Sequence, residues 1–284
     1  MDFIEILKAI VQGIVQGITE WLPVSSTGHI LLLNVIWPME VSQDFFDVFK
    51  VVIQLGSILA VVVLYFHKLN PFSPRKSVAE KKGTWRLWLM VLIASVPAGV
   101  AGLLLNDIVD DKFSLTPVIA AALIVYGIAF IVMETVRKTP KCQSLAAITP
   151  KTALGIGLFQ MLSLVPGTSR SGSTILGATL FGLSRPVAAE FSFFMAIPVM
   201  LGASGLKFVK ALLVDKVSFT GQEWALLIIG TVVSFLVSLV VIRFLMGFIK
   251  KHDFKPFGWY RIALGVVVLL LFAFSVLPLQ ADMI

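Results

Sequence analysis

Two polar segments interrupt long apolar runs in this sequence, and the first of them places a carboxylate beside amide side chains. Gln12, Gln16 and Glu20 recur every four residues, so a helix would carry all three on one face. A carboxylate in that position can bind a cation or exchange a proton. Hydrogen bonding between packed helices would explain the same polar face without any catalytic role.

A turn rich in hydroxyl groups follows. It reads Pro23-Val-Ser-Ser-Thr-Gly-His29, and a helix beginning near Ser25 would bring Ser26 and His29 onto one face. Serine, histidine and a carboxylate together can perform nucleophilic or general acid–base catalysis. The alternative is a histidine that only satisfies a neighbouring polar group. Four further polar residues would either line the same cavity or mark helix ends at the interface: Asp47, Lys50, Gln54 and Glu190.

The second polar segment contains an arginine among small residues. It reads Gln160-Met-Leu-Ser-Leu-Val-Pro166-Gly-Thr-Ser-Arg170-Ser-Gly-Ser-Thr174. Small residues let the backbone approach a ligand closely, and the N-terminus of a following helix offers N–H groups to an anion. Arg170 adds a permanent charge whose fork of donors fits phosphate oxygens. The segment therefore indicates a phosphate cradle, and a packing bend between helices is the alternative.

The composition shows where these segments must lie. The chain has 284 residues, of which 58% are hydrophobic and only 14% are charged, and its mean hydropathy is +0.96. A soluble domain carries about 25% charged residues, and a single cysteine excludes a disulfide-stapled secreted module. We therefore expect a polytopic membrane protein. A charge on Glu20 would then cost about 2.5 to 3.5 kcal/mol, so this side chain should be protonated, paired or in contact with water.

The net charge of +7 could indicate nucleic-acid binding, but the basic residues cluster between apolar runs. Cytoplasmic loops of membrane proteins are enriched in lysine and arginine. We therefore expect three inner loops, no nucleic-acid partner, and a reduced, exposed thiol at Cys142 in the second loop. The clusters are Lys68, Arg75, Lys76, Lys81, Lys82 and Arg86; then Arg137, Lys138, Lys141 and Lys151; then Arg243, Lys250, Lys251, Lys255 and Arg261.

Six stretches are long enough to span a membrane, which takes about 20 apolar residues. They lie at about 45–66, 85–105, 117–136, 190–212, 224–247 and 258–278. The connections near 106–116 and 214–223 are acidic or neutral and are expected outside, together with the C-terminus. Their charged residues are Asp107, Asp110, Asp111, Lys112, Asp215, Lys216 and Glu223, and Asp282 follows in the C-terminus.

Two broken segments remain, at residues 3–37 and 151–184. Each is apolar at both ends and is interrupted by Pro, Gly, Ser and Thr. Each enters and leaves on one side of the membrane, so both are predicted to be re-entrant helix hairpins, the first from outside and the second from inside. Asp2 and Glu5, in place of a basic start, argue against a signal peptide at residues 1–22.

An internal repeat relates the two halves of the chain, about 1–141 and 142–284. A shift of about 143 residues aligns Pro23 with Pro166, Ser26 with Ser169, and the first three spans with the last three. Because three spans per half is an odd number, the second half must be inserted upside down, and such repeats bring broken helices together near the midplane. The predicted fold is an all-α polytopic membrane protein. It forms a single integral-membrane domain over residues 1–284, each half comprising one re-entrant hairpin and three transmembrane helices.

These motifs resemble those of a known family. Gln16-x-x-x-Glu20, the turn from Pro23 to His29, and Pro166-Gly-Thr-Ser-Arg-Ser-Gly172 together look like the undecaprenyl-diphosphate phosphatases of bacteria, also called the bacitracin-resistance family. The resemblance covers essentially the whole chain. It implies hydrolysis of undecaprenyl diphosphate to undecaprenyl phosphate and inorganic phosphate, which recycles the lipid carrier of peptidoglycan synthesis and gives bacitracin resistance. It also implies a Mg²⁺ or Ca²⁺ ion, and an active site facing the outer side of the bacterial plasma (inner) membrane.

The resemblance assigns roles by position. Glu20, Ser26, His29 and Arg170 are implied to be catalytic. From their chemistry we expect Ser26 to attack or to position an attacking water, and His29 to act as base and later as acid. Many family members carry Glu where this chain has Gln16, so Gln16 is expected to orient substrate or metal beside Glu20. The implied substrate-binding residues are Gln16, Ser25, Thr27, Gly167, Thr168, Ser169, Ser171, Gly172 and Thr174.

The expected partners are a polyprenyl diphosphate substrate and membrane lipids, and a homodimer is left open. A secondary transporter or flippase for a lipid phosphate or anion is the main alternative, because inverted repeats that meet at the midplane are a transporter architecture. Arg170 would then bind the anion and Glu20 would relay protons. Another class of lipid-phosphate phosphatase needs a histidine where this chain has Leu176. A purely structural membrane subunit would leave Glu20, His29 and Arg170 unexplained.

Overall fold

The computed structural model of the chain describes residues 2–137, 139–214 and 216–279. Within these ranges the backbone forms helices and connecting loops, and no β-strand. Lys138, Asp215 and Asp282, which helped to orient the chain, lie outside the described residues. The side chains of Asp107, Asp110 and Asp111 lie outside them as well.

Six of the described helices are long and apolar enough to cross a membrane. They coincide with the six predicted spans, which confirms the prediction of an all-helical, polytopic membrane protein. The stretch near 106–113, expected to be part of a loop, instead continues a long helix, so that only Ser114 and Leu115 precede the next one. The six are α3 (Gln43–Leu64), α5 (Val78–Phe113), α6 (Thr116–Val136), α9 (Arg185–Leu213), α10 (Gly221–Lys251) and α11 (Lys255–Ala273).

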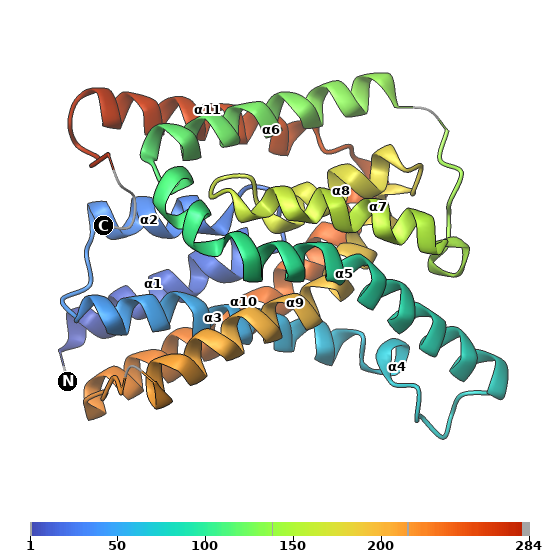
Figure 1. Cartoon of the computed structure of the whole chain (residues 1–284), viewed down its shortest axis with the longest axis horizontal. Coiled ribbons are helices and arrows are strands. Elements are labelled where there is room, and N and C mark those ends of the chain that lie inside the picture. The colour runs from blue at the N-terminus through green and yellow to red at the C-terminus, as the bar shows by residue number, and fades with distance from the viewer. Residues whose placement is uncertain (1, 138, 215, 280–284) are drawn as a thin grey trace.

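The two polar segments fold as pairs of short helices joined by turns. The first pair is α1 (Phe3–Thr19) and α2 (Ser26–Ile36), and the second is α7 (Pro150–Met161) and α8 (Arg170–Leu180). In Figure 1, α1 leads from the end of the molecule that holds the N-terminus to its middle, and α2 returns to that end; α7 and α8 do the same from the opposite end. The predicted helix breaks therefore lie close together in the middle of the bundle.

Each turn ends in a serine with an unusual backbone conformation. Ser25 and Ser169, which cap the N-termini of α2 and α8, have φ angles of +77° and +72°. Residues other than glycine rarely adopt positive φ, and such strained positions cluster at ligand-binding and active sites. Ser169 caps α8 with its own side chain, because its Oγ accepts a hydrogen bond from the N–H of Gly172 at 3.1 Å.

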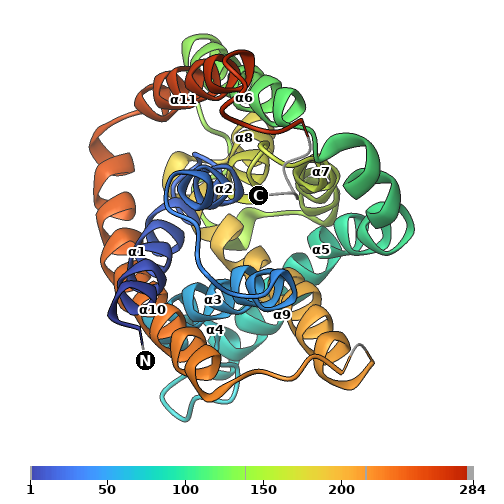
Figure 2. The same cartoon turned by 90° about the vertical axis from the view of Figure 1, so that its left-hand side faces the viewer.

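The long helices enclose these turns. α6 packs along α11, α10 packs against both α1 and α3, and α5 packs against α7. Figure 2 looks along the bundle and shows α2 and α8 inside a ring of longer helices. A short helix, α4 (Phe66–Leu69), lies in the connection between α3 and α5. α8 is almost wholly buried, so the phosphate-type motif sits in the interior of the protein.

Two residues of the predicted basic loops are placed differently by the structure. Arg261 lies in the second turn of α11 with 0% of its surface exposed, so it is not a loop residue. Cys142 is only 9% exposed, which corrects the expectation of an exposed thiol. Its backbone is held against the end of α8, since its N–H donates to Gly182 O at 3.0 Å and its carbonyl accepts from Ser184 N–H at 2.9 Å.

Glycine lets α1 approach α10 closely. A Cβ added at Gly13 would lie 2.6 Å from the carbonyl oxygen of Gly230 and 3.0 Å from the Cβ of Val233. Gly13→Ala is therefore expected to destabilise the protein by about 1 to 3 kcal/mol, because overpacking forces backbone shifts. Gly99→Ala is the matched control, since no atom lies within 4 Å of a Cβ there. Unfolding midpoints in an SDS titration test this prediction, and equal midpoints for the two variants would contradict it.

Candidate active site

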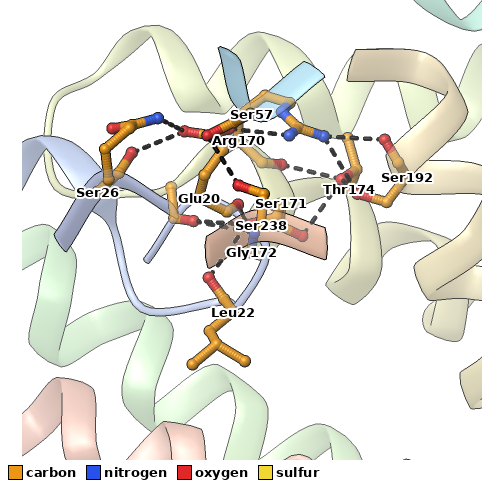
Figure 3. Close-up of polar contacts among 12 residues, drawn as sticks. Glu20, Leu22, Ser26, Ser57, Arg170, Ser171, Gly172, Thr174, Ser192 and Ser238 are labelled. Atoms are coloured by element: carbon orange, nitrogen blue, oxygen red, sulfur yellow. Dashed lines mark hydrogen bonds and ion pairs between the residues drawn. The ribbon is translucent and has the colours of Figure 1, made fainter. Parts of the chain in front are cut away.

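Glu20 connects the two polar turns. It caps the C-terminus of α1, and its side chain is 5% exposed. Its Oε1 accepts a hydrogen bond from Arg170 Nη2 at 2.9 Å, while its Oε2 accepts from Gln16 Nε2 at 3.1 Å and from Ser26 Oγ at 2.9 Å (Figure 3). Of the three environments considered for Glu20, the structure shows pairing. Four residues predicted from separate motifs thus form one cluster.

Arg170 is held on three sides. Its Nη1 donates to the backbone oxygen of Ser192 at 2.8 Å, and its guanidinium lies over the ring of Trp21, 5.6 Å from the centroid. Trp21 is completely buried and packs edge-to-face on Phe193. The Nε of Arg170 is buried and has no hydrogen-bond partner in the described part of the chain. The contacts therefore fix the guanidinium in place and leave one of its N–H donors without a partner among the described residues.

A small cavity lies where the two turns meet. Its volume is about 120 Å³, well below the roughly 300 to 1,000 Å³ of sites that enclose drug-sized ligands. It can take a phosphate-sized headgroup but not a long hydrocarbon tail. A larger hollow of about 410 Å³ near the α6–α7 connection contains none of the motif residues. The small cavity is lined by Glu20, Ser25, Ser26, Thr27, Gln54, Ser163, Val165, Pro166, Gly167, Ser169, Arg170 and Met200.

His29 lies on α2 with Ser26, but the two side chains have different partners. Nδ1 of His29 is 2.6 Å from the carbonyl oxygen of Ser25, and Nε2 is 2.6 Å from the hydroxyl of Tyr260. The ring also stacks on Tyr260, with 5.6 Å between centroids. The hydroxyl of Ser26 instead donates a hydrogen bond to Glu20 Oε2. The structure therefore pairs the serine with the carboxylate and not with the histidine that sequence spacing suggested.

Several of the expected substrate-binding residues hold the turns together. Ser171 Oγ donates to the backbone oxygen of Glu20 at 2.9 Å and so joins the second turn to the first. Thr174 Oγ1 donates to Arg170 O at 2.9 Å and lies 2.5 Å from Ser192 Oγ. Thr168 Oγ1 donates to Leu162 O at 2.9 Å. These hydroxyls are bonded to the protein itself and, like Gly172, do not line the cavity.

Comparison with known proteins identifies the family of this chain. Residues 9–267 match the family described as "Bacitracin resistance protein BacA". The chain belongs to this family. It is 58% identical to Undecaprenyl-diphosphatase 1 of Clostridioides difficile (strain 630) over 271 residues, which are 95% of this chain and 97% of the relative. It is 53% identical to Undecaprenyl-diphosphatase of Enterococcus faecalis, over 97% of this chain and 100% of the relative. It is 56% identical to Undecaprenyl-diphosphatase of Lactiplantibacillus plantarum, over 94% of this chain and 97% of the relative.

In this BacA family member, the resemblance inferred from the two turns is therefore confirmed, and both motifs lie inside the matched residues. The match also agrees with the six apolar helices in identifying a multi-pass membrane protein.

Three of the additional polar residues considered for the cavity lie elsewhere. Asp47 pairs with Lys50 at 2.8 Å, and Glu190 pairs with Lys68 at 2.6 Å. Gln54 does line the cavity.

The structure adds residues to the BacA site to which the sequence had assigned no role. Ser163 and Met200 line the cavity, and Ser192 holds Arg170 through its carbonyl oxygen. Serines inside apolar helices are common, so Ser192 carried no signal of its own. The sequence did contain a signal for Arg261, because this residue falls inside the predicted span at 258–278 and not between spans. A charge within a span is a sign of a buried functional residue.

Proposed function

We propose that this protein hydrolyses undecaprenyl diphosphate to undecaprenyl phosphate and inorganic phosphate. The main support is the contact between Glu20, Ser26 and Arg170 at a cavity of headgroup size. The names of the curated relatives point to the same substrate. In a bacterium, this reaction would recycle the lipid carrier of peptidoglycan synthesis and give resistance to bacitracin.

The contacts suggest how the reaction proceeds. Ser26 Oγ attacks the terminal phosphorus, forming a new O–P bond while the bridging P–O bond breaks and undecaprenyl phosphate leaves with the bridging oxygen. The serine proton passes to Glu20 Oε2, to which it already donates at 2.9 Å. Water then attacks the phosphoserine, the bond between Ser26 Oγ and phosphorus breaks, and Glu20 returns the proton to Ser26 Oγ. Both water protons leave with inorganic phosphate.

The charge that develops on the transferred phosphoryl group would be stabilised by donors from the second turn. The Nε of Arg170 has no hydrogen-bond partner among the described residues. The N–H groups of Arg170 and Ser171, at the start of α8, have no partner within their own helix. Phosphoryl transfer depends mainly on such positioning and on charge stabilisation at the equatorial oxygens. His29 then acts as a positioning residue, because it contacts the carbonyl oxygen of Ser25 beside the nucleophile.

Ser26→Ala is expected to lower kcat by about 10³-fold or more, as removal of a nucleophile does in other hydrolases. Release of inorganic phosphate by purified protein measures the effect, and labelled phosphate should remain on Ser26 after acid quenching of the intact enzyme. Ser95→Ala is the control, because Ser95 lies in α5 outside the cavity and its Oγ donates to Val91 O. A Ser26→Ala variant that keeps most of its activity would show that water attacks directly.

A divalent cation, Mg²⁺ or Ca²⁺, is proposed to bind at Gln16 and Glu20. The Oε1 of Gln16 is buried and lacks a hydrogen-bond partner among the described residues, although it lies beside the Glu20 carboxylate. Carboxylate and amide oxygens suit these ions, which also take water and phosphate oxygens as ligands. The described side chains contain no group of three or more His, Cys, Asp and Glu that could hold a metal. A bound ion would neutralise charge on the diphosphate.

The two short-helix pairs are proposed to be re-entrant hairpins of two inverted repeats, about 1–141 and 142–284, within one integral-membrane domain. The packing supports this relation, because α1 packs on α10 in the second half just as α7 packs on α5 in the first. The positive φ angles of Ser25 and Ser169, each at the end of its turn, are a second shared feature.

The protein is proposed to lie in the bacterial plasma membrane with the site open to the outer side. The connections that carry the first two basic clusters, between α3 and α5 and between α6 and α7, lie at the end of the molecule opposite the N-terminus in Figure 1. Positively charged connections face the cytoplasm. The polyprenyl tail would remain in the lipid against the apolar helix surfaces, so only the headgroup enters the cavity.

Release of inorganic phosphate from undecaprenyl diphosphate tests the proposed function directly. Purified protein in detergent should release phosphate when Mg²⁺ or Ca²⁺ is present, and much less after chelation by EDTA. No release with either ion would favour the transporter alternative. Uptake of a lipid phosphate or an anion into proteoliposomes would then be the next measurement.

A further inference from the structure

One buried arginine holds the backbones of both turns. Arg261 of α11 donates from Nη1 to the carbonyl oxygen of Pro23 at 3.1 Å. Its Nη2 donates to the carbonyl oxygens of Gly167 at 2.8 Å and Thr168 at 3.0 Å. Gly167 has a φ of +92°, a conformation that favours glycine. The guanidinium thus joins the turn that carries Ser26 to the turn that carries the phosphate-type motif.

No carboxylate in the described part of the chain forms an ion pair with Arg261. Its guanidinium carbon lies 5.5 Å from the centroid of the Tyr126 ring. Arg185 makes the contrast clear, because it forms a two-pronged pair with Glu134 at 2.8 and 2.6 Å. A buried, unpaired charge is costly. An anionic ligand nearby would offset this cost when the site is filled.

The peptide group between Thr168 and Ser169 lies between Arg261 and the cavity. In a trans peptide the C=O and N–H groups point in opposite directions. Arg261 binds the carbonyl oxygen of Thr168, so the N–H of Ser169 points away from Arg261, and Ser169 lines the cavity. The neighbouring N–H of Thr168 is already used, since it donates to Val165 O at 3.2 Å.

We propose that Arg261 is a positioning residue for the phosphate site. It orients and polarises the Thr168–Ser169 peptide so that the Ser169 N–H donates to a phosphate oxygen. Its uncompensated charge adds to the attraction that Arg170 exerts on the diphosphate. The inference rests on the proposed phosphatase function for its kinetic test, but phosphate binding can be measured without turnover.

Two substitutions separate charge from geometry. Arg261→Gln keeps an amide donor for the carbonyl oxygens but removes the charge, and it should lower kcat by about 10² to 10³-fold, the typical effect of losing one oxyanion donor. It should also raise the inhibition constant of inorganic phosphate by about tenfold or more. Arg261→Lys keeps the charge but loses the fork, so kcat should fall by about tenfold while the inhibition constant changes by less than about threefold. Arg243→Gln, at an exposed position of α10, is the matched control.

The unfolding midpoint of every variant is measured beside its kinetics. A lowered midpoint for Arg261→Gln with native kcat and native phosphate inhibition would overturn the proposal and leave a structural role only. If this variant does not fold, Arg261→Lys decides, because a native kcat without the fork excludes the positioning role.

Binding of pyrophosphate to the Ser26→Ala protein, measured by calorimetry, keeps this inference distinct from the proposed function. Adding Arg261→Gln to the Ser26→Ala protein should weaken pyrophosphate binding by about tenfold. Adding Arg261→Lys, which is used if the Gln variant does not fold, should weaken it by less than about threefold. Weaker binding to the Gln variant would support the role of Arg261 even if the intact protein released no phosphate. Unchanged pyrophosphate affinity in Arg261→Gln would refute it whatever the catalytic activity.

Discussion

Arg170→Ala is expected to lower kcat/KM for undecaprenyl diphosphate by about 10³-fold or more, because arginines that stabilise phosphoryl transfer contribute about 10³ to 10⁵ in rate. Arg170 lines the cavity, and its Nε has no hydrogen-bond partner among the described residues. The substitution also leaves the buried Glu20 carboxylate without its ion-pair partner. Initial rates of phosphate release over a range of lipid concentrations measure the change.

Arg170→Lys distinguishes the charge from the shape of the guanidinium. Lysine keeps the positive charge but cannot contact Glu20 and the carbonyl oxygen of Ser192 with the same planar fork. We expect an intermediate loss in kcat/KM of about 10 to 10²-fold. Arg243→Ala, at an exposed position on α10, should behave like the native protein. An Arg170→Ala variant within threefold of native activity would mean that phosphate binds elsewhere.

Glu20→Gln is expected to lower kcat by about 10² to 10⁴-fold, the usual contribution of a general base. The amide has nearly the same shape but cannot take the proton that Ser26 donates to Oε2. It also binds a cation more weakly than a carboxylate does. The rate of phosphate release is measured while Mg²⁺ is titrated from zero to saturation.

The cation titration separates the two roles of Glu20. If the carboxylate only held the ion, a high Mg²⁺ concentration would restore kcat in Glu20→Gln, and this result would contradict a role as proton acceptor. We expect the apparent affinity for Mg²⁺ to fall and kcat to stay low at saturation. Glu223→Gln, which changes a capping residue at the start of α10, is the control and should retain native kcat.

Pairing of Ser26 with Glu20 changes the chemistry that sequence spacing suggested. Ser26 and His29 are three residues apart on α2, and this spacing alone favoured a serine–histidine pair. Their actual partners come from α1 and α11. A helix face tells which side chains lie on the same side, but the direction of each hydrogen bond depends on what the neighbouring helices bring within about 3 Å.

The amino-acid sequence by itself determined the helical membrane class, the positions of the six spans and the two breaks, because apolar run length and Pro/Gly/Ser interruptions act locally. It also placed Glu20, Ser26 and Arg170 in the candidate site. Only the tertiary structure decided that these side chains meet, that His29 contacts Tyr260, and that the charge of Arg261 is buried beneath both turns. Such contacts join residues far apart in the chain, and their geometry follows from the packing of whole helices, which no local pattern encodes.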